Sequence, residues 1–83
     1  MKVKVKYFAS IREGVGLGHE AFDTPASTLG ALRDDLIARG GAYADSLARG
    51  RAVRVALNQV MSDESAALMD GCEVAFFPPV TGG

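Results

Sequence analysis

The residues of this sequence that could do chemistry lie at its end, where the chain reads Phe77-Pro78-Pro79-Val80-Thr81-Gly82-Gly83. Two prolines fix φ near −65° and remove two backbone donors, so a β-strand cannot continue past them. The six residues from Pro78 can extend about 20 Å, enough to carry a terminal carboxylate into another protein's active site. Because glycine has no Cβ atom, Gly82 and Gly83 could pass through a narrow channel. We therefore expect these two glycines to carry the chemistry.

A carboxylate is a poor acyl donor, because attack on it would have to expel oxide. It must first become an acyl-adenylate with ATP, and the sequence has no phosphate-binding loop followed by Lys-Ser or Lys-Thr that could do this. We expect a partner enzyme to activate Gly83, after which the acyl group could accept sulfur, as a thiocarboxylate, or an amine, as in protein conjugation. The alternative is an ordinary frayed terminus, although two final glycines arise by chance only about 0.5% of the time.

The other residues with reactive side chains are isolated from one another in the sequence. His19 is the only histidine, and no nucleophile lies beside it to suggest a catalytic triad. Cys72 is the only cysteine, so it cannot form an internal disulfide, and no cationic neighbour favours its thiolate. Asp34-Asp35 and Asp63-Glu64 are interpreted as solvated charges, because adjacent residues point in different directions. We expect no metal site.

Length and composition restrict the class of protein. Eighty-three residues, 48% hydrophobic and 23% charged, fit one small domain. The net charge of −1 is too balanced for a protein that binds by neutralising phosphates, so nucleic acid is not an expected partner. The apolar runs are far shorter than the roughly 20 residues of a membrane-spanning helix. The amino-terminal residues also lack the apolar stretch of a signal peptide, so we expect a cytoplasmic protein.

The spacing of apolar residues predicts the elements that must hold the tail. Residues 2–8 alternate, with Val3, Val5 and Tyr7 on one face, which predicts a strand. Alternation and turn signals predict four more strands, at 19–23, 51–57, 60–62 and 73–77. The clearest helix begins after Thr28 as its N-cap and ends near Arg39. Shorter helical pieces are expected over 10–15 and 42–48.

The helix that follows Thr28 has one apolar face, made of Leu29, Leu32, Leu36 and Ile37. Together with the strands, this face predicts an α+β domain in which one main helix covers one face of a mixed sheet of about five strands. We expect this domain to span residues 1–77 and the tail to span residues 78–83.

The opposite face of the sheet is unusually apolar. By alternation Val74 and Phe76 point toward the helix, whereas Ala75 and Phe77 point away from it. If the first and last strands are neighbours, Phe8 and Phe77 form an exposed patch with Ala56 and Ala75 that suits a protein partner. The alternative is two isolated surface aromatics, which are common.

On these residues the chain resembles the MoaD-type sulfur carriers, the small subunits of molybdopterin synthase, over essentially all of its length. Val5-Lys6-Tyr7-Phe8-Ala9 is similar to the family's opening strand, and Val55-Ala56-Leu57-Asn58-Gln59 to its central strand and turn. The ending from Glu73 to Gly83 is the most specific match, while Cys72 departs from the polar residue that the family usually carries there. The resemblance implies a β-grasp fold, as in ubiquitin.

The resemblance also implies a role. An ATP-dependent, ubiquitin-activating-like adenylyltransferase would adenylate Gly83, and a sulfur donor would convert it to a thiocarboxylate. The sulfur would pass to cyclic pyranopterin monophosphate on the large subunit of molybdopterin synthase, in a heterotetramer. This chain would bind no cofactor itself and would leave the catalytic side chains to the large subunit. The expected interface residues are Phe8, Phe77, Pro78, Pro79, Val80 and Thr81.

Three alternatives remain at this point. The same carrier chemistry could serve thiamine, cysteine or transfer-RNA thiolation. Gly83 could instead form an amide with a lysine of a target, as in a ubiquitin-like modifier. The domain could also be an interaction-only β-grasp module with an incidental tail.

Overall fold

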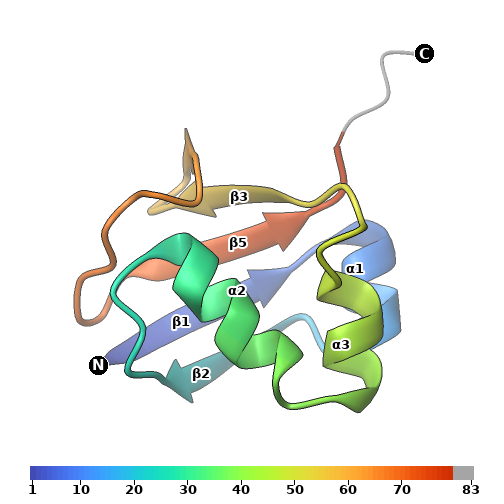
Figure 1. The fold of residues 1–83 in the computed structure, drawn as a ribbon. Coiled ribbons are helices and arrows are strands. Elements are labelled where there is room, and N and C mark those ends of the chain that lie inside the picture. The colour runs from blue at the N-terminus through green and yellow to red at the C-terminus, as the bar shows by residue number, and fades with distance from the viewer. Residues whose placement is uncertain (80–83) are drawn as a thin grey trace.

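In the computed structural model, which describes residues 1–79, five strands form one mixed sheet with helices packed on one face (Figure 1). The strands are β1 (Lys2–Tyr7), β2 (His19–Asp23), β3 (Arg54–Leu57), β4 (Val60–Ser62) and β5 (Glu73–Phe77). The helices are α1 (Ala9–Val15), α2 (Leu29–Ile37) and α3 (Gly41–Leu47). The sheet order is β2-β1-β5-β3-β4; β1 and β5 run parallel, and the other neighbours antiparallel. This arrangement confirms the predicted α+β, β-grasp fold.

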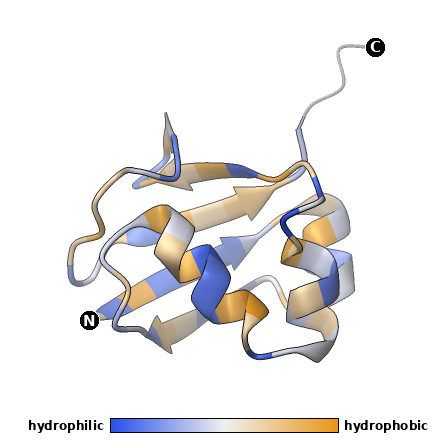
Figure 2. Cartoon of the chain, in the orientation of Figure 1, coloured by the Kyte–Doolittle hydropathy of each residue, from blue (hydrophilic) through white to orange (hydrophobic). Residues whose placement is uncertain are grey.

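The core lies between the sheet and the helices. The inward residues of β1 and β5 are at most 1% exposed: Val3, Val5, Tyr7, Val74 and Phe76. Leu29, Leu32 and Leu36 of α2 are fully buried against them, as their spacing predicts. Figure 2 shows hydrophobic positions recurring along the strands and on the helices that cover them. The core therefore fixes β5, the strand that leads into the tail.

The ends of the elements follow local chemistry. Thr28 caps α2 as predicted, because its Oγ1 accepts a hydrogen bond from the Ala31 amide at 3.1 Å. The helix ends at Ile37, two residues before the predicted end, and the chain then turns through Gly40 at φ 76°. Between β3 and β4, Asn58 and Gln59 adopt φ of 50° and 70°, which makes the predicted two-residue turn.

Two predicted strand boundaries were wrong. β1 ends at Tyr7, because Phe8 is the N-cap residue of α1. β3 begins at Arg54 rather than Arg51, because the Arg51 carbonyl accepts a hydrogen bond from the Arg33 guanidinium instead of pairing with a strand. The two helical pieces predicted near 10–15 and 42–48 are present as α1 and α3.

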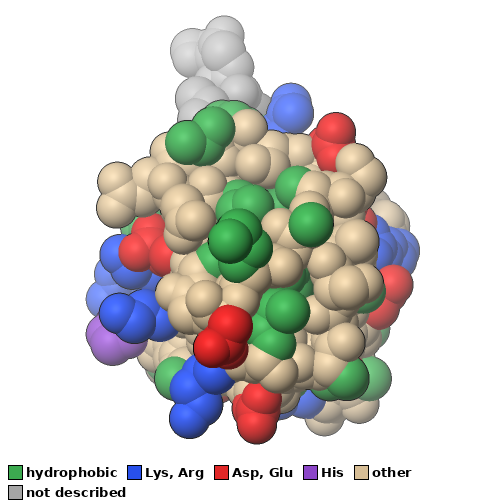
Figure 3. Space-filling view, turned by 90° about the vertical axis from the view of Figure 1, so that its left-hand side faces the viewer, with side chains coloured by type: hydrophobic (Ala, Val, Ile, Leu, Met, Phe, Trp, Pro, Cys, Tyr) green, Lys and Arg blue, Asp and Glu red, His purple; other side chains and the backbone are tan. Residues whose placement is uncertain are grey.

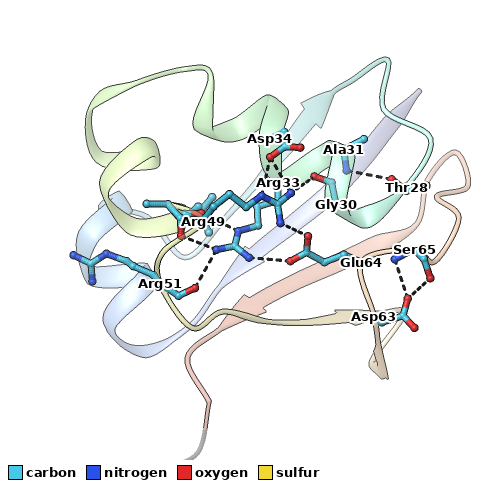
Figure 4. Close-up of polar contacts among 12 residues, drawn as sticks. Thr28, Gly30, Ala31, Arg33, Asp34, Arg49, Arg51, Asp63, Glu64 and Ser65 are labelled. Atoms are coloured by element: carbon cyan, nitrogen blue, oxygen red, sulfur yellow. Dashed lines mark hydrogen bonds and ion pairs between the residues drawn. The ribbon is translucent and has the colours of Figure 1, made fainter.

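Arg33 is a buried charge at the centre of a polar network (Figure 4), and it is 4% exposed. Its guanidinium donates to the carbonyls of Leu47, Ala48 and Arg51 at 2.8, 2.7 and 3.2 Å, and to Glu64 at 2.8 Å. The interaction ties α2 to the segment that connects α3 with β3. That segment therefore keeps a fixed position although it has no regular secondary structure.

The interpretation of the carboxylate pairs as solvated charges was wrong for two of the four residues, Asp35 and Glu64, which are half-buried. Asp35 accepts a hydrogen bond from Thr24, and Glu64 bridges Arg33 and Arg49. Asp34 pairs with Arg49, but its side chain is 63% exposed. Partial burial opposes the charged form of Glu64, but the hydrogen bonds from the two arginines outweigh it and lower its pKa. Only Asp63 caps a local turn, at Ser65, as expected.

A second polar cluster surrounds Glu20 on β2. The hydroxyls of Tyr7 and Tyr43 donate to its Oε2 at 2.9 and 2.6 Å, and Arg39 donates to Oε1 at 3.2 Å. Burial opposes ionisation of Glu20, but these three hydrogen bonds outweigh it, and the pKa of Glu20 is lowered. Burial and the bond to Glu20 raise the pKa of both tyrosines, which therefore remain neutral donors.

Glu20 should make the unfolding free energy depend on pH in the acidic range. Because its pKa in the folded state lies below the ordinary 4.5, its ionised form stabilises the fold above that pH and this stabilisation is lost as the pH falls through the folded value. Glu20→Gln is therefore expected to flatten the fall in unfolding free energy below pH 4.5, measured by urea denaturation. The control is Glu13→Gln, since exposed Glu13 makes no ion pair or hydrogen bond within residues 1–79. Equal slopes for both variants would contradict the assignment.

Candidate functional site

The tail leaves the domain from the middle of the sheet. β5 pairs with β1 on one side and β3 on the other, and it ends at Phe77. Pro78 and Pro79 follow and are half-buried. We call Phe77, Pro78 and Pro79 the tail root. The other predicted tail residues, Val80, Thr81, Gly82 and Gly83, lie outside the described residues.

The outer face of the sheet carries an apolar patch next to the tail root, which we call the outer-face patch. It consists of Phe8, Ala56, Met61, Ala75 and Phe77. Register places Ala75 beside Ala56, and Ala56 beside Met61, across β5, β3 and β4. Phe8 is 45% exposed and Met61 is 60% exposed. A row of apolar side chains thus crosses three neighbouring strands.

The outer-face patch differs from the predicted one in two respects. Ala56 and Ala75 are only 8% exposed, because their short side chains lie between the larger side chains of their neighbours, so the expectation that they would be exposed was wrong. Met61 was missed, because three residues of β4 are too few to establish an alternating pattern. The exposed part of the patch is therefore formed by its larger side chains, and the two alanines between them are buried.

The sharp turn after β1 places Phe8 beside β5. The Phe8 amide donates to the Phe76 carbonyl at 3.1 Å, and the Phe8 carbonyl accepts from the amides of Ile11 and Arg12 at 3.2 Å. Ala9 then adopts φ 51°, a left-handed conformation that few residues other than glycine take. Because β1 and β5 are parallel, Phe8, which follows β1, and Phe77, the last residue of β5, lie at the same end of the sheet.

Charged residues border the outer-face patch. Lys6 lies beside Ala75 and forms an ion pair with Glu73 at 3.3 Å, while Arg54 lies opposite Phe77. His19, opposite Lys6, is exposed on the edge strand β2. Figure 3 shows the histidine side chain beside Lys and Arg side chains along one margin of the molecule. An apolar centre with a charged rim is typical of protein interfaces.

The described residues contain few groups that could perform chemistry by themselves. Cys72 is buried, at 5% exposed. Within residues 1–79 no three His, Cys, Asp or Glu residues are grouped so that they could hold a metal ion. None of the helices in that range has the length and apolar character needed to cross a membrane. The arrangement is suited to docking another protein and presenting the tail to it.

The chain is similar to known proteins in both sequence and structure. Residues 5–83 match the ThiS family. The chain is 41% identical to the molybdopterin synthase sulfur carrier subunit of Escherichia coli, over 98% of this chain and 99% of that protein. Among solved structures it is similar to SAMP1 from Haloferax volcanii, with 26% identity, a TM-score of 0.78 and full coverage of both chains. The complex of subunits 1 and 2 of the molybdopterin-converting factor from Helicobacter pylori also matches, with 28% identity, a TM-score of 0.69 and full coverage of both chains.

Proposed function

The chain belongs to the ThiS family, and from this membership we propose that it is the sulfur-carrier subunit of a molybdopterin synthase. The observation that carries the proposal is the match to a molybdopterin synthase sulfur carrier subunit over nearly the whole of both proteins. The geometry supports it, since the central strand β5 runs directly into a proline-stiffened tail beside an apolar docking surface.

The proposed reaction begins on a partner enzyme. The Gly83 carboxylate attacks the α-phosphorus of ATP, pyrophosphate leaves, and an acyl-adenylate forms. Sulfide-level sulfur (HS⁻) supplied by a donor then attacks the acyl carbon, forms the C–S bond and displaces AMP, which leaves a thiocarboxylate on Gly83. On the large subunit, this sulfur passes to cyclic pyranopterin monophosphate, and water supplies the oxygen that restores the carboxylate. We place the cycle in the cytoplasm, where thiols stay reduced, and in a heterotetramer with the large subunit.

The domain's contribution to this cycle is to hold the sulfur in place. When the outer-face patch docks on the large subunit, the thiocarboxylate becomes effectively unimolecular with its target, which removes much of the entropic barrier. No side chain of the domain then has to take part in proton transfer. The rigid sheet is the part that makes docking reproducible, because β5 is anchored on both sides.

The intact mass of the protein isolated from its native host tests the proposal. We expect a fraction of molecules in which one terminal oxygen is replaced by sulfur, and we expect the large synthase subunit to co-purify. A protein without sulfur under sulfur-replete conditions would contradict carrier chemistry. Recovery of a thiazole-forming or another sulfur-accepting enzyme in place of the large subunit would assign the carrier to a different pathway.

Phe8→Ala is expected to weaken binding to the large subunit at least about tenfold, because a large exposed aromatic at an interface commonly contributes more than 1.4 kcal/mol. Isothermal titration calorimetry with the large subunit measures the effect. Met69→Ala is the matched control, since Met69 is 68% exposed but lies outside the outer-face patch. Equal losses for the two variants would show that the patch is not the docking surface.

A ubiquitin-like modifier is the second candidate function. It is favoured by the similarity to the small archaeal modifier protein 1 from Haloferax volcanii, with 25% identity and a TM-score of 0.76. In that case Gly83 would form an amide with a lysine, and AMP would leave when the lysine amine attacks the acyl-adenylate. Conjugates that resist both reductant and hydroxylamine would support this function. If a thiocarboxylate is found and no such conjugates are found, only the carrier function is supported.

A further inference from the structure

A groove of about 580 Å³ opens beside the tail root, between α1 and α3. Its lining residues are Ser10, Ile11, Gly14, Gly41, Ala42, Asp45, Ser46, Arg51, Ala52, Val53 and Pro78. A Cβ atom at position 14 would clash with Ser46 Oγ, so glycine at this position permits the close approach of the two helices. The groove is thus built by the packing of α1 on α3 and shares Pro78 with the tail.

The groove has a mixed polar and apolar lining, with two charges that lack side-chain partners within the described residues. Ile11, Ala42 and Val53 supply apolar surface. Neither the Arg51 guanidinium nor the Asp45 carboxylate makes a hydrogen bond or an ion pair with another side chain of residues 1–79. The Arg51 carbonyl, by contrast, is held by Arg33, and Figure 4 shows the Arg51 side chain pointing away from that network. The backbone is fixed while the cation remains available.

The groove is continuous with the proposed docking surface. The first turn of α1 connects Phe8, on the outer-face patch, with Ser10, on the groove wall, and Pro78 belongs to both the tail root and the groove. A stable interface covers about 800 Å² on each partner and roughly 20 to 30 residues. The five residues of the outer-face patch and the tail are too few for that. A protein that surrounds the tail root must therefore extend over neighbouring surface, and the groove is part of it.

We propose that this groove is a second contact for the large subunit of molybdopterin synthase, an inference that rests on the proposed function. The segment that fills it presents an apolar side chain to the interior. A carboxylate beside that side chain pairs with Arg51, and a hydrogen-bond donor faces Asp45. Because Arg51 and Asp45 line the groove beside apolar residues, they select the partner segment by charge as well as by shape.

Two substitutions test the groove with a matched control for each. Ala42→Phe fills the groove, and its control is Ala31→Phe, at an exposed position on α2 away from the groove. Arg51→Glu reverses the rim cation, and its control is Lys2→Glu, at the opposite end of β1 from the tail root. We expect each groove variant to bind the large subunit from the same organism about tenfold more weakly in titration calorimetry, and each control to bind as the parent does. Thermal melting verifies that all four variants are folded.

The outcomes separate this inference from the function on which it rests. If the parent chain binds the large subunit and both groove variants bind equally well, the inference is overturned and the proposed function stands. If the parent chain does not bind at all, the proposed function fails, and the inference fails with it. The same variants are also titrated with the activating adenylyltransferase. If they bind the large subunit as the parent does but lose binding to that enzyme, the groove belongs to the enzyme and the assignment to the large subunit is wrong.

Discussion

Removal of Gly82 and Gly83 is expected to abolish thiocarboxylate formation completely while leaving the domain as stable as before. The reacting carboxylate would then belong to Thr81, whose Cβ and shorter reach prevent it from entering a channel built for two glycines. Stability should not change, because terminal residues contribute little to a folded core, and the buried hydrophobic residues found within residues 1–79 lie between Val3 and Phe76. Intact mass after incubation with the activating enzyme, ATP and a sulfur donor measures the first effect, and thermal denaturation measures the second.

A variant that keeps the length of the tail distinguishes two requirements for thiocarboxylate formation, namely a tail that is long enough and side chains that fit the partner's channel. Gly82→Val retains all residues and the terminal carboxylate of Gly83, but it adds a β-branched side chain, which is stiff and disfavours the conformations that glycine allows. We expect it to lose thiocarboxylate formation nearly as fully as the truncation. If Gly82→Val is fully active, the channel is wide, and only the length of the tail matters. If the truncated chain is also active, Gly83 is not the reacting residue and the proposed chemistry is wrong.

The parts of the fold that could be predicted from the sequence are those with a strong local pattern. Val3, Val5 and Tyr7 alternate over a full strand, and burial of one face leaves that strand a single register. The Thr28 cap and the leucine spacing likewise define α2. Boundaries set by distant partners could not be predicted. The start of β3, for example, depends on a hydrogen bond that the Arg51 carbonyl accepts from Arg33, eighteen residues before Arg51.

The candidate site was predictable to a similar degree. Phe8 and Phe77 could be placed on one face by alternation once the first and last strands were taken as neighbours, and the parallel pairing of β1 with β5 supplies that condition. The groove beside the tail root could not be found this way, because α1, α3 and residues 51–53 approach one another only in three dimensions. The one local sign was Gly14, where the absence of a Cβ atom leaves room for Ser46 of α3.

Arg33 shows what a pattern of apolar residues conceals. It lies four residues after Leu29 and three before Leu36, so it falls inside the buried stripe of α2 rather than on the solvent face. A cation at such a position signals a buried partner, but its four acceptors are spread over residues 47–64. Three of these acceptors are backbone carbonyls, which no side-chain pattern reveals. The position could be recognised from the sequence, whereas the partners could not.

Arg33→Met is expected to lower the unfolding free energy by about 3 kcal/mol, the second large effect predicted for this chain. Methionine can replace the aliphatic stem of Arg33 but donates no hydrogen bond. The carbonyls of Leu47 and Ala48 would then lose their donor, and a backbone carbonyl cannot be removed by a compensating substitution. The loss should appear as a lower urea midpoint with an unchanged slope.

Arg49→Met is the matched control, because Arg49 also bonds Glu64 but has a side chain that is 46% exposed. Exposed ion pairs contribute about 1 kcal/mol or less to stability, so Arg49→Met should lower the unfolding free energy by no more than that. Both substitutions remove an arginine that bonds to Glu64. Arg33→Lys should lower the unfolding free energy about as much as Arg33→Met does. The lysine ammonium keeps the charge, but it cannot reach the carbonyls of Leu47, Ala48 and Arg51 together. Equal losses for Arg33→Met and Arg49→Met would mean that the segment before β3 is held by its apolar contacts, and that the wall of the groove does not depend on the buried guanidinium.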